Sequence, residues 1–242
     1  MKTRATRLLA VATLTGILLA ATACAAPQPA ATSPAATTAA ETAPATPAST
    51  EASAPETPKA AALKTFTFPD GHVSFTHPAG WTVKTKPGPA LNAEAQKTSY
   101  VATVFDASGA ELAHVLSGMY GDGAAGPAKR TVLDHAPVPG IKDLRGGESI
   151  EFGFAYDEQP GGGSIGGPYY FMDVRRAHEF LPNQDTSGSN QVQLPNGVLT
   201  ASVIFAGIDS APPFASPDAA KAWMGSEQYA QLKAMLLSLS YK

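Results

Sequence analysis

Apolar and polar residues alternate in short runs over most of residues 64–242, and clusters of turn-forming residues separate the runs. A period of two is typical of strands that are buried on one face. Turns such as Pro69-Asp70-Gly71 and Asp106-Ala107-Ser108-Gly109 join neighbouring runs, so the strands are expected mainly as antiparallel hairpins. The predicted strands cover residues 66–68, 73–75, 81–83, 100–105, 111–116, 131–135, 150–156, 169–178 and 198–205.

Residues near the C-terminus follow a helical pattern instead. Ser216-Pro217-Asp218 is a helix start signal, because serine caps a helix and proline fits its first turn. Gly225-Ser226 interrupts this helix and starts a second one. Apolar residues then recur at helical spacing and predict a face that packs on the sheet: Tyr229, Leu232, Met235, Leu236 and Leu239. A further short helix is expected within residues 87–98.

Together these elements predict an α+β fold. Its antiparallel sheet of about six to eight strands packs against a C-terminal helix, and other helices are few and short. Strands come first and helices late, which argues against a doubly wound arrangement with alternating strands and helices.

The first 24 residues have the parts of an export signal. Lys2, Arg4 and Arg7 precede an uncharged apolar run of 16 residues from Leu8 to Ala23, shorter than the roughly 20 that a spanning helix needs. Small residues then lead to Cys24, the only cysteine. This segment resembles bacterial lipoprotein signals, in which the cysteine is acylated and the peptide before it is removed. The alternative is an ordinary cleavage site at Ala21-Thr22-Ala23 that leaves Cys24 as a free thiol.

The composition changes after Cys24. Alanine, proline, threonine and serine dominate up to about residue 62, and this stretch holds no aromatic residue. Such a segment buries too little apolar surface to offset its ordering entropy, so a disordered tether is expected. The chain therefore divides into a signal peptide (1–23), a lipidated cysteine with its tether (24–63) and a single globular domain (64–242).

Charge and cysteine content limit the possible partners. One cysteine allows no disulfide within the chain, so the domain depends on its core for stability. Loss of the three leader cations lowers the net charge from −3 to −6, which argues against nucleic acid and against polybasic contact with anionic lipid. Short basic pairs such as Lys129-Arg130 and Arg175-Arg176 are expected at solvated edges. The predicted location is the outer face of the cell membrane, facing the wall, with an acyl anchor in the membrane.

Several stretches are similar to PsbP-like domains. They are the run from Phe68 to Trp81, then Tyr169-Tyr170-Phe171, Asn196-Gly197-Val198-Leu199, and the segment from Met235 to Leu239. LpqN-type lipoproteins of mycobacteria are thought to share this fold and have the same anchor and tether, so the chain resembles an actinobacterial lipoprotein. The resemblance implies an antiparallel sheet between helices and a non-catalytic accessory or binding role. It carries no catalytic residue to this chain.

Gly162-Gly163-Ser164-Ile165-Gly166 matches the G-x-S-x-G pattern of a nucleophile elbow. An elbow needs a strand before it and a helix after it, whereas strand-forming residues follow here. Only His178 lies downstream as a base, with Asp173 as the one acid between them. A hairpin loop is therefore the preferred interpretation, and a serine hydrolase using Ser164 and His178 is the alternative.

Cofactor and metal signals are weak. Residues 121–126 and 161–166 fit G-x-G-x-x-G, but neither stretch opens a helix in a βαβ frame. The five histidines form no H-E-x-x-H, and His72 and His77 are expected at the surface or in turns. Asn183, Asp185 and Ser187 imitate half of a calcium loop, yet Leu194 occupies the place of its closing glutamate. We expect no cofactor and no metal.

Aromatic and apolar residues gather near loops: Tyr156, Tyr169, Tyr170, Phe171 and Pro212-Pro213-Phe214. Core packing explains most of them, but a groove between sheet and helix for a lipid, a glycan or a peptide would use the same residues. The sequence thus predicts a lipid-anchored envelope protein that is not an enzyme and that binds a ligand or another envelope protein.

Overall fold

The computed structural model describes residues 62–121, 126–158, 167–184, 188–205 and 212–242. The predicted signal peptide, Cys24 and all but the last two residues of the predicted tether lie outside the described residues. So do Ser164 and most of both G-x-G-x-x-G stretches.

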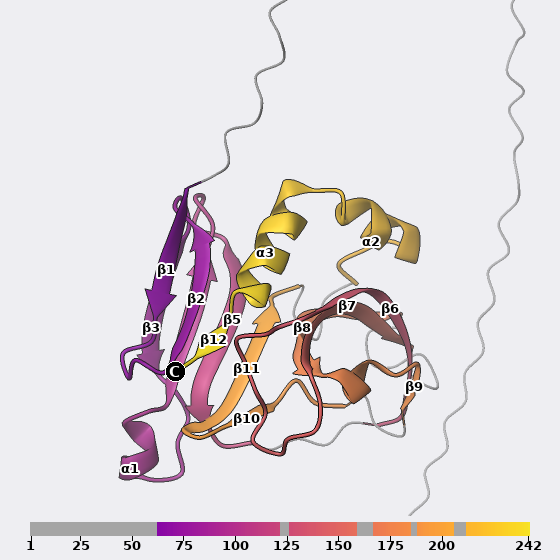
Figure 1. The fold of residues 1–242 in the computed structure, drawn as a ribbon. Helices are drawn as coiled ribbons and strands as arrows, with labels where there is room; N and C mark the ends of the chain where they lie inside the picture. Colours follow the sequence, from indigo (N-terminus) through magenta and orange to yellow (C-terminus); the bar gives the residue numbers. More distant parts are fainter. Residues whose placement is uncertain (1–61, 122–125, 159–166, 185–187, 206–211) are drawn as a thin grey trace, which may run out of the picture. The chain divides into compact units, whose positions relative to one another are not determined.

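A large antiparallel sheet forms most of the domain (Figure 1). Its strands follow the order β3-β4-β5-β11-β8-β7-β6-β9, and β10 pairs with β11 beside this path. The bounds are β3 Thr82–Pro87, β4 Tyr100–Phe105, β5 Glu111–Met119, β6 Ala128–Pro137, β7 Ile150–Glu158, β8 Tyr169–Arg176, β9 Asn183–Gln184, β10 Val192–Leu194 and β11 Gly197–Val203. The predicted α+β class with an antiparallel sheet is confirmed.

A second, three-stranded sheet has the order β1-β2-β12, with bounds β1 Leu63–Thr67, β2 Val73–Pro78 and β12 Ser240–Tyr241. The first two strands form the predicted hairpin, with Phe66 opposite Phe75. The third strand comes from the C-terminus and pairs with β2, while the amide of Tyr241 donates to the carbonyl of Gly140 at 2.9 Å. β12 therefore joins the small sheet to the loop after β6.

The helices are α1 Ala93–Gln96, a 3-10 turn η2 at Ala177–Phe180, α2 Pro217–Trp223 and α3 Glu227–Leu237. Ser216 and Ser226 cap α2 and α3, since each hydroxyl accepts an amide hydrogen bond from three residues on. α2 and α3 lie together on one side of the large sheet (Figure 1). None of the helices in the described ranges is long and apolar enough to cross a bilayer.

The core lies between the two sheets and α3. The predicted helical stripe is buried and belongs to one cluster with residues of both sheets: Tyr229, Leu232, Met235, Leu236 and Leu239. α3 contacts β2 of the small sheet and β7 of the large one. The apolar face of α3 thus packs against both sheets, as the sequence pattern indicates.

The structure extends the predictions in two places. β6 spans ten residues rather than the five expected, because the polar residues Lys129 and Arg130 before the predicted run also pair with β7. The short strands β9, β10 and β12 were not predicted, since two or three residues carry no measurable period.

Candidate functional site

An apolar pocket of about 260 Å³ opens between the end of β11, the loop before α2, and the two C-terminal helices. Nine residues line it: Leu112, Val203, Ile204, Phe205, Pro213, Phe214, Trp223, Gln228 and Leu232. Gln228 is the one polar side chain among them, and none is ionisable. A cavity of about 150 Å³ suffices for a benzene ring, so this pocket has room for one ring with a short chain, or for a short acyl chain.

Aromatic rings continue from the pocket into the core. Phe214 has the central place, since its ring centroid lies 5.5 Å from Trp223, 5.6 Å from Phe205 and 5.9 Å from Phe154. Its closest ring neighbour is Tyr170, at 5.0 Å in an edge-to-face arrangement. Such pairs add to the stability supplied by burial alone, so the walls of the pocket are held in place.

Local sequence signals position these rings. Phe205 follows β11, where the amide of Ile204 still donates to the carbonyl of Leu112 at 2.9 Å. Phe214 stands two residues before the Ser216 cap, and Trp223 is the last residue of α2. The elbow between α2 and α3 then brings Gln228 to the pocket. The pocket is therefore built at a strand end and two helix ends, not inside one element.

The structure divides the aromatic group predicted from the sequence. Tyr156, Tyr170 and Phe214 lie on the helix side of the sheet, with Tyr156 and Tyr170 5.3 Å apart. Phe171 faces the opposite side and packs in a separate cluster, and Tyr169 stacks on it at 6.4 Å. Neighbours on a strand point to opposite faces, so Tyr169 and Phe171 lie away from the pocket. Pro213 and Phe214 are the members of the predicted group that line it.

Sequence reasoning placed Pro213 and Phe214 in a candidate groove and missed the other lining residues, among them Phe205, Trp223 and Leu232. Phe205 was assigned to a strand core, and Trp223 was treated only as part of a helix. Leu232 was expected in the apolar face of α3, without a role at an opening. Phe205 and Trp223 share one signal, their position: Phe205 lies just after β11 and Trp223 is the last residue of α2.

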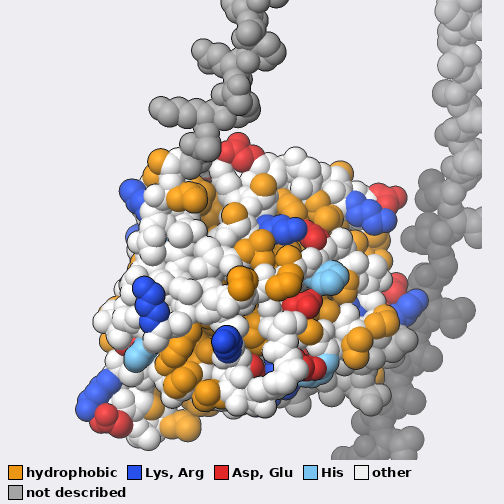
Figure 2. Space-filling model, viewed as in Figure 1, with side chains coloured by type: hydrophobic (Ala, Val, Ile, Leu, Met, Phe, Trp, Pro, Cys, Tyr) orange, Lys and Arg blue, Asp and Glu red, His pale blue; other side chains and the backbone are white. Residues whose placement is uncertain are grey.

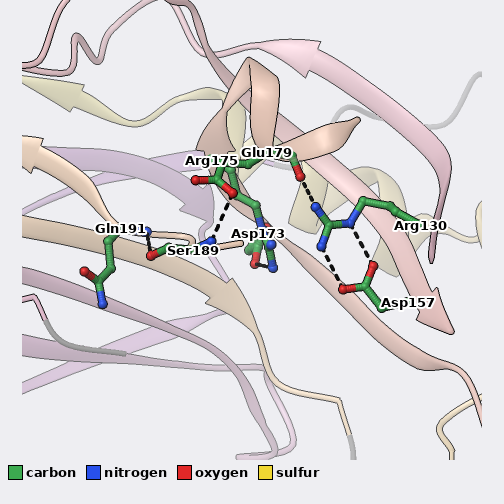
Figure 3. A network of polar contacts seen from close by, with 7 residues as sticks. All are labelled: Arg130, Asp157, Asp173, Arg175, Glu179, Ser189 and Gln191. Atoms are coloured by element: carbon green, nitrogen blue, oxygen red, sulfur yellow. Dashed lines mark hydrogen bonds and ion pairs between the residues drawn. The ribbon is translucent and has the colours of Figure 1, made fainter. Parts of the chain in front are cut away.

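The opposite face of the large sheet holds a buried network of charges (Figure 3). Arg130 on β6 donates to both carboxylate oxygens of Asp157 on β7, at 2.8 and 2.7 Å. Arg175 on β8 donates in the same bidentate way to Asp173, at 2.8 Å for both bonds. The basic pairs were expected at solvated edges, and this prediction was wrong for Arg130 and Arg175, which are 3% and 7% exposed.

The Phe171 ring explains how two cations are buried here. The guanidinium carbons of Arg175 and Arg130 lie 3.9 and 4.9 Å from its centroid. Planar guanidinium groups stack on aromatic faces and match carboxylates, unlike lysine. Burial raises the pKa of Asp173, against the opposing attraction of Arg175.

Residues after β8 complete this network of ion pairs and hydrogen bonds. The Glu179 carbonyl accepts a hydrogen bond from Arg130, and its carboxylate accepts bonds from Arg176 at 3.0 Å and from the Ser189 amide at 3.2 Å. Figure 3 shows Glu179 between Arg130, which binds Asp157, and Ser189, which in turn contacts Gln191. Each charge has an opposite charge as its partner, so we interpret the network as structural.

The residues of the alternative hydrolase site are not brought together among the described ranges. Ser164 lies outside them. Nδ1 of His178 contacts Glu148, and its Nε2 lies 3.4 Å from Glu179. Both oxygens of Asp173 face Arg175, so the acid predicted between them serves an ion pair.

Metal and cofactor predictions can be examined only in part. Within the described ranges, no group of three or more His, Cys, Asp or Glu residues could hold a metal ion. Asp185 and Ser187 of the half calcium loop lie outside those ranges. His77, expected at the surface or in a turn, is buried on β2 beside Phe75, with ring centroids 6.3 Å apart.

The visible surface carries no continuous patch of one charge. Figure 2 shows lysine and arginine side chains spread over this face, with acidic and hydrophobic side chains between them. Comparison with family models, with curated proteins and with solved structures finds no match for this chain. The resemblance to PsbP-like domains therefore stays a prediction.

Proposed function

We propose that this chain is an envelope lipoprotein, anchored through Cys24 to the outer face of the cell membrane, whose domain binds a small uncharged apolar ligand. The domain is proposed to act by binding and not by catalysis. The observation that carries this proposal is the aromatic pocket, with three half-buried rings and no ionisable side chain among the described residues that line it.

The chemistry of the lining residues determines which class of ligand the pocket can bind. Phe205, Phe214 and Trp223 offer apolar faces, and burying apolar ligand surface against them is favourable at about 25 cal/mol per Å². An ionised group would lose its hydration there without an opposite charge to replace it. We therefore propose a lipid-like ligand with a short aliphatic or aromatic body, not a charged peptide or an anionic sugar.

A proposed anchor and an apolar pocket support the same role. Acylation at Cys24 would keep the domain close to membrane lipids, which are the main source of uncharged apolar chains outside the cell. A pocket that holds one short chain suits a carrier or a sensor of such molecules. No charged partner is needed for this function.

The test is a binding titration with N-phenyl-1-naphthylamine, an uncharged aromatic probe whose fluorescence rises in apolar surroundings. Its single phenyl ring matches the volume of the pocket, and its naphthyl group would lie across the mouth. The purified domain should bind it at one site. Gln228→Trp places a large side chain at the mouth of the pocket, from an exposed position on α3. We expect this variant to weaken binding by at least about tenfold, a loss of 1.4 kcal/mol.

The matched control is Gln231→Trp, because Gln231 lies on the same helix but does not line the pocket. Equal binding by the wild type and Gln231→Trp, with weak binding by Gln228→Trp, supports the proposal. Absence of binding by the wild type, or equal binding by both variants, contradicts it.

The non-catalytic part has its own test, because the alternative is a serine hydrolase. A fluorophosphonate probe labels activated serines covalently. We expect that any labelling of the wild type does not depend on Ser164 or His178, so that it is unchanged in Ser164→Ala and in His178→Ala. Labelling that both variants abolish would replace the binding proposal with hydrolysis.

A further inference from the structure

The hydroxyl of Tyr170 is buried and has no hydrogen-bond partner among the residues that the structure describes. Tyr170 lies on β8, is 3% exposed, and has its ring among the aromatic residues behind the pocket. A buried polar group that lacks a partner costs about 1–3 kcal/mol, and phenylalanine would fill the same space without this cost. Packing of the core therefore does not explain why this position has a hydroxyl group.

Phe214 connects this hydroxyl to the pocket. Its ring contacts Tyr170 on one side, at 5.0 Å, and lines the pocket together with Phe205 and Trp223. The other ring beside Tyr170 is Tyr156, at 5.3 Å. The free O–H thus lies in apolar surroundings, one ring away from the space proposed for the ligand.

We propose that Tyr170 donates a hydrogen bond to an oxygen of the ligand, reached when the ring of Phe214 turns aside. This inference rests on the proposed function of the pocket and adds the class of ligand. The ligand is an uncharged amphiphile with a carbonyl oxygen, such as an acyl ester or a ketone, attached to a short apolar body.

The chemistry of both partners determines this class. Burial, together with Tyr156, raises the pKa of Tyr170, so its hydroxyl remains a donor over the physiological range. A carbonyl oxygen is an acceptor without a charge, so it satisfies the donor at a low desolvation cost. A carboxylate would need a cation, and the described residues of the lining include none.

The experiment compares two ligands that differ in one group. Pentylbenzene and valerophenone have the same skeleton, but valerophenone has a carbonyl in place of the methylene next to the ring. Each is used to displace N-phenyl-1-naphthylamine from the wild type, from Tyr170→Phe and from Tyr156→Phe. Tyr170→Phe should bind valerophenone about fivefold more weakly, as the loss of one hydrogen bond implies, and pentylbenzene unchanged.

Tyr156→Phe is the matched control, since Tyr156 is the other tyrosine of the same cluster. It should change neither affinity. An equal affinity of the wild type and Tyr170→Phe for valerophenone overturns the inference while the pocket remains supported. Failure of both ligands to displace the probe, or failure of the probe to bind, overturns the proposed function as well.

A second measurement does not depend on the variant. The carbonyl stretch of valerophenone moves to lower frequency when its oxygen accepts a hydrogen bond. Infrared spectra of the bound ligand in the wild type should show this shift. An unshifted band for the bound ligand contradicts the inference.

Discussion

The hydroxyl of Tyr229 on α3 donates a hydrogen bond of 2.5 Å to Oδ2 of Asp134 on β6, and Nζ of Lys233 donates to the same oxygen at 2.5 Å. Burial disfavours the charge of Asp134, but these hydrogen bonds and the attraction of Lys233 outweigh it and lower its pKa. Burial and the bond to Asp134 raise the pKa of Tyr229. These two hydrogen bonds hold α3, which also lines the pocket through Leu232, against β6 of the large sheet.

Asp134→Asn should therefore lower the free energy of unfolding at pH 7 by about 1.5–3 kcal/mol, the range for hydrogen bonds to charged groups. A carboxylate with a lowered pKa stabilises the fold above its unfolded value of about 3.9, and this contribution disappears as pH falls through the folded value. The gap between wild type and variant should thus close in acid. Urea unfolding at pH 7 and pH 3 measures it, and a gap that is as large at pH 3 as at pH 7 would contradict the assignment.

The ion pair of Arg130 and Asp157 gives a second prediction. Arg130→Met leaves a buried carboxylate without a partner and should destabilise the domain by about 3–5 kcal/mol. Adding Asp157→Asn removes that charge, so the double variant should be more stable than the sum of the single effects. Equilibrium unfolding of all four proteins gives the coupling energy.

Lys129→Met is the control for this cycle. Lys129 is the neighbour of Arg130 on β6, but its side chain is 73% exposed and 3.7 Å from Glu158. Exposed pairs contribute about 0–1 kcal/mol, so this variant should be nearly as stable as the wild type. Similar losses for Lys129→Met and Arg130→Met would show that burial does not decide the effect.

Gly153 supplies a test of the packing under η2. A Cβ at this position would lie 2.0 Å from Cε1 of Phe180, so Gly153→Ala forces the ring to move. Overpacking of this kind destabilises by about 1–3 kcal/mol. Phe180→Leu should recover part of that loss in the double variant, as thermal unfolding would show. Gly80→Ala, where a Cβ meets nothing within 4 Å, should be neutral.

The anchor gives a prediction outside the described residues. Cys24→Ser removes the thiol that would receive the lipid, so the protein should leave the membrane fraction and appear in the medium. Fractionation and immunoblotting of the host measure this directly. Retention of Cys24→Ser in the membrane would contradict lipid anchoring at this residue.

The sequence predicted the fold better than the site. Alternating runs such as Ile150 to Tyr156 mark their strands, and the Ser216 and Ser226 caps mark their helices, because these signals are local. The burial of Arg130 could not be predicted, since its partner Asp157 lies on β7 and the Phe171 ring on β8. Arg175 shares β8 with Asp173 and Phe171, but the strand alone does not show that this face is covered. Tertiary pairing decides whether a basic residue on a strand is solvated or buried.

The pocket shows the same limit. Phe214 was placed in a candidate groove from its neighbours in the sequence, whereas Phe205 and Trp223 were not. The three rings meet only because the end of β11 and the end of α2 converge. Such convergence depends on strand order, and the order β5-β11-β8 joins strands that are distant in the chain.

Native mass spectrometry of the Cys24→Ser protein, purified from its own host, tests the central claim most directly. Native and denatured masses should differ by one discrete adduct of low mass, and Gln228→Trp should abolish it while Gln231→Trp retains it. The adduct mass would also identify the ligand class. A bare chain in every sample, or an adduct that Gln228→Trp leaves in place, would contradict binding in the aromatic pocket.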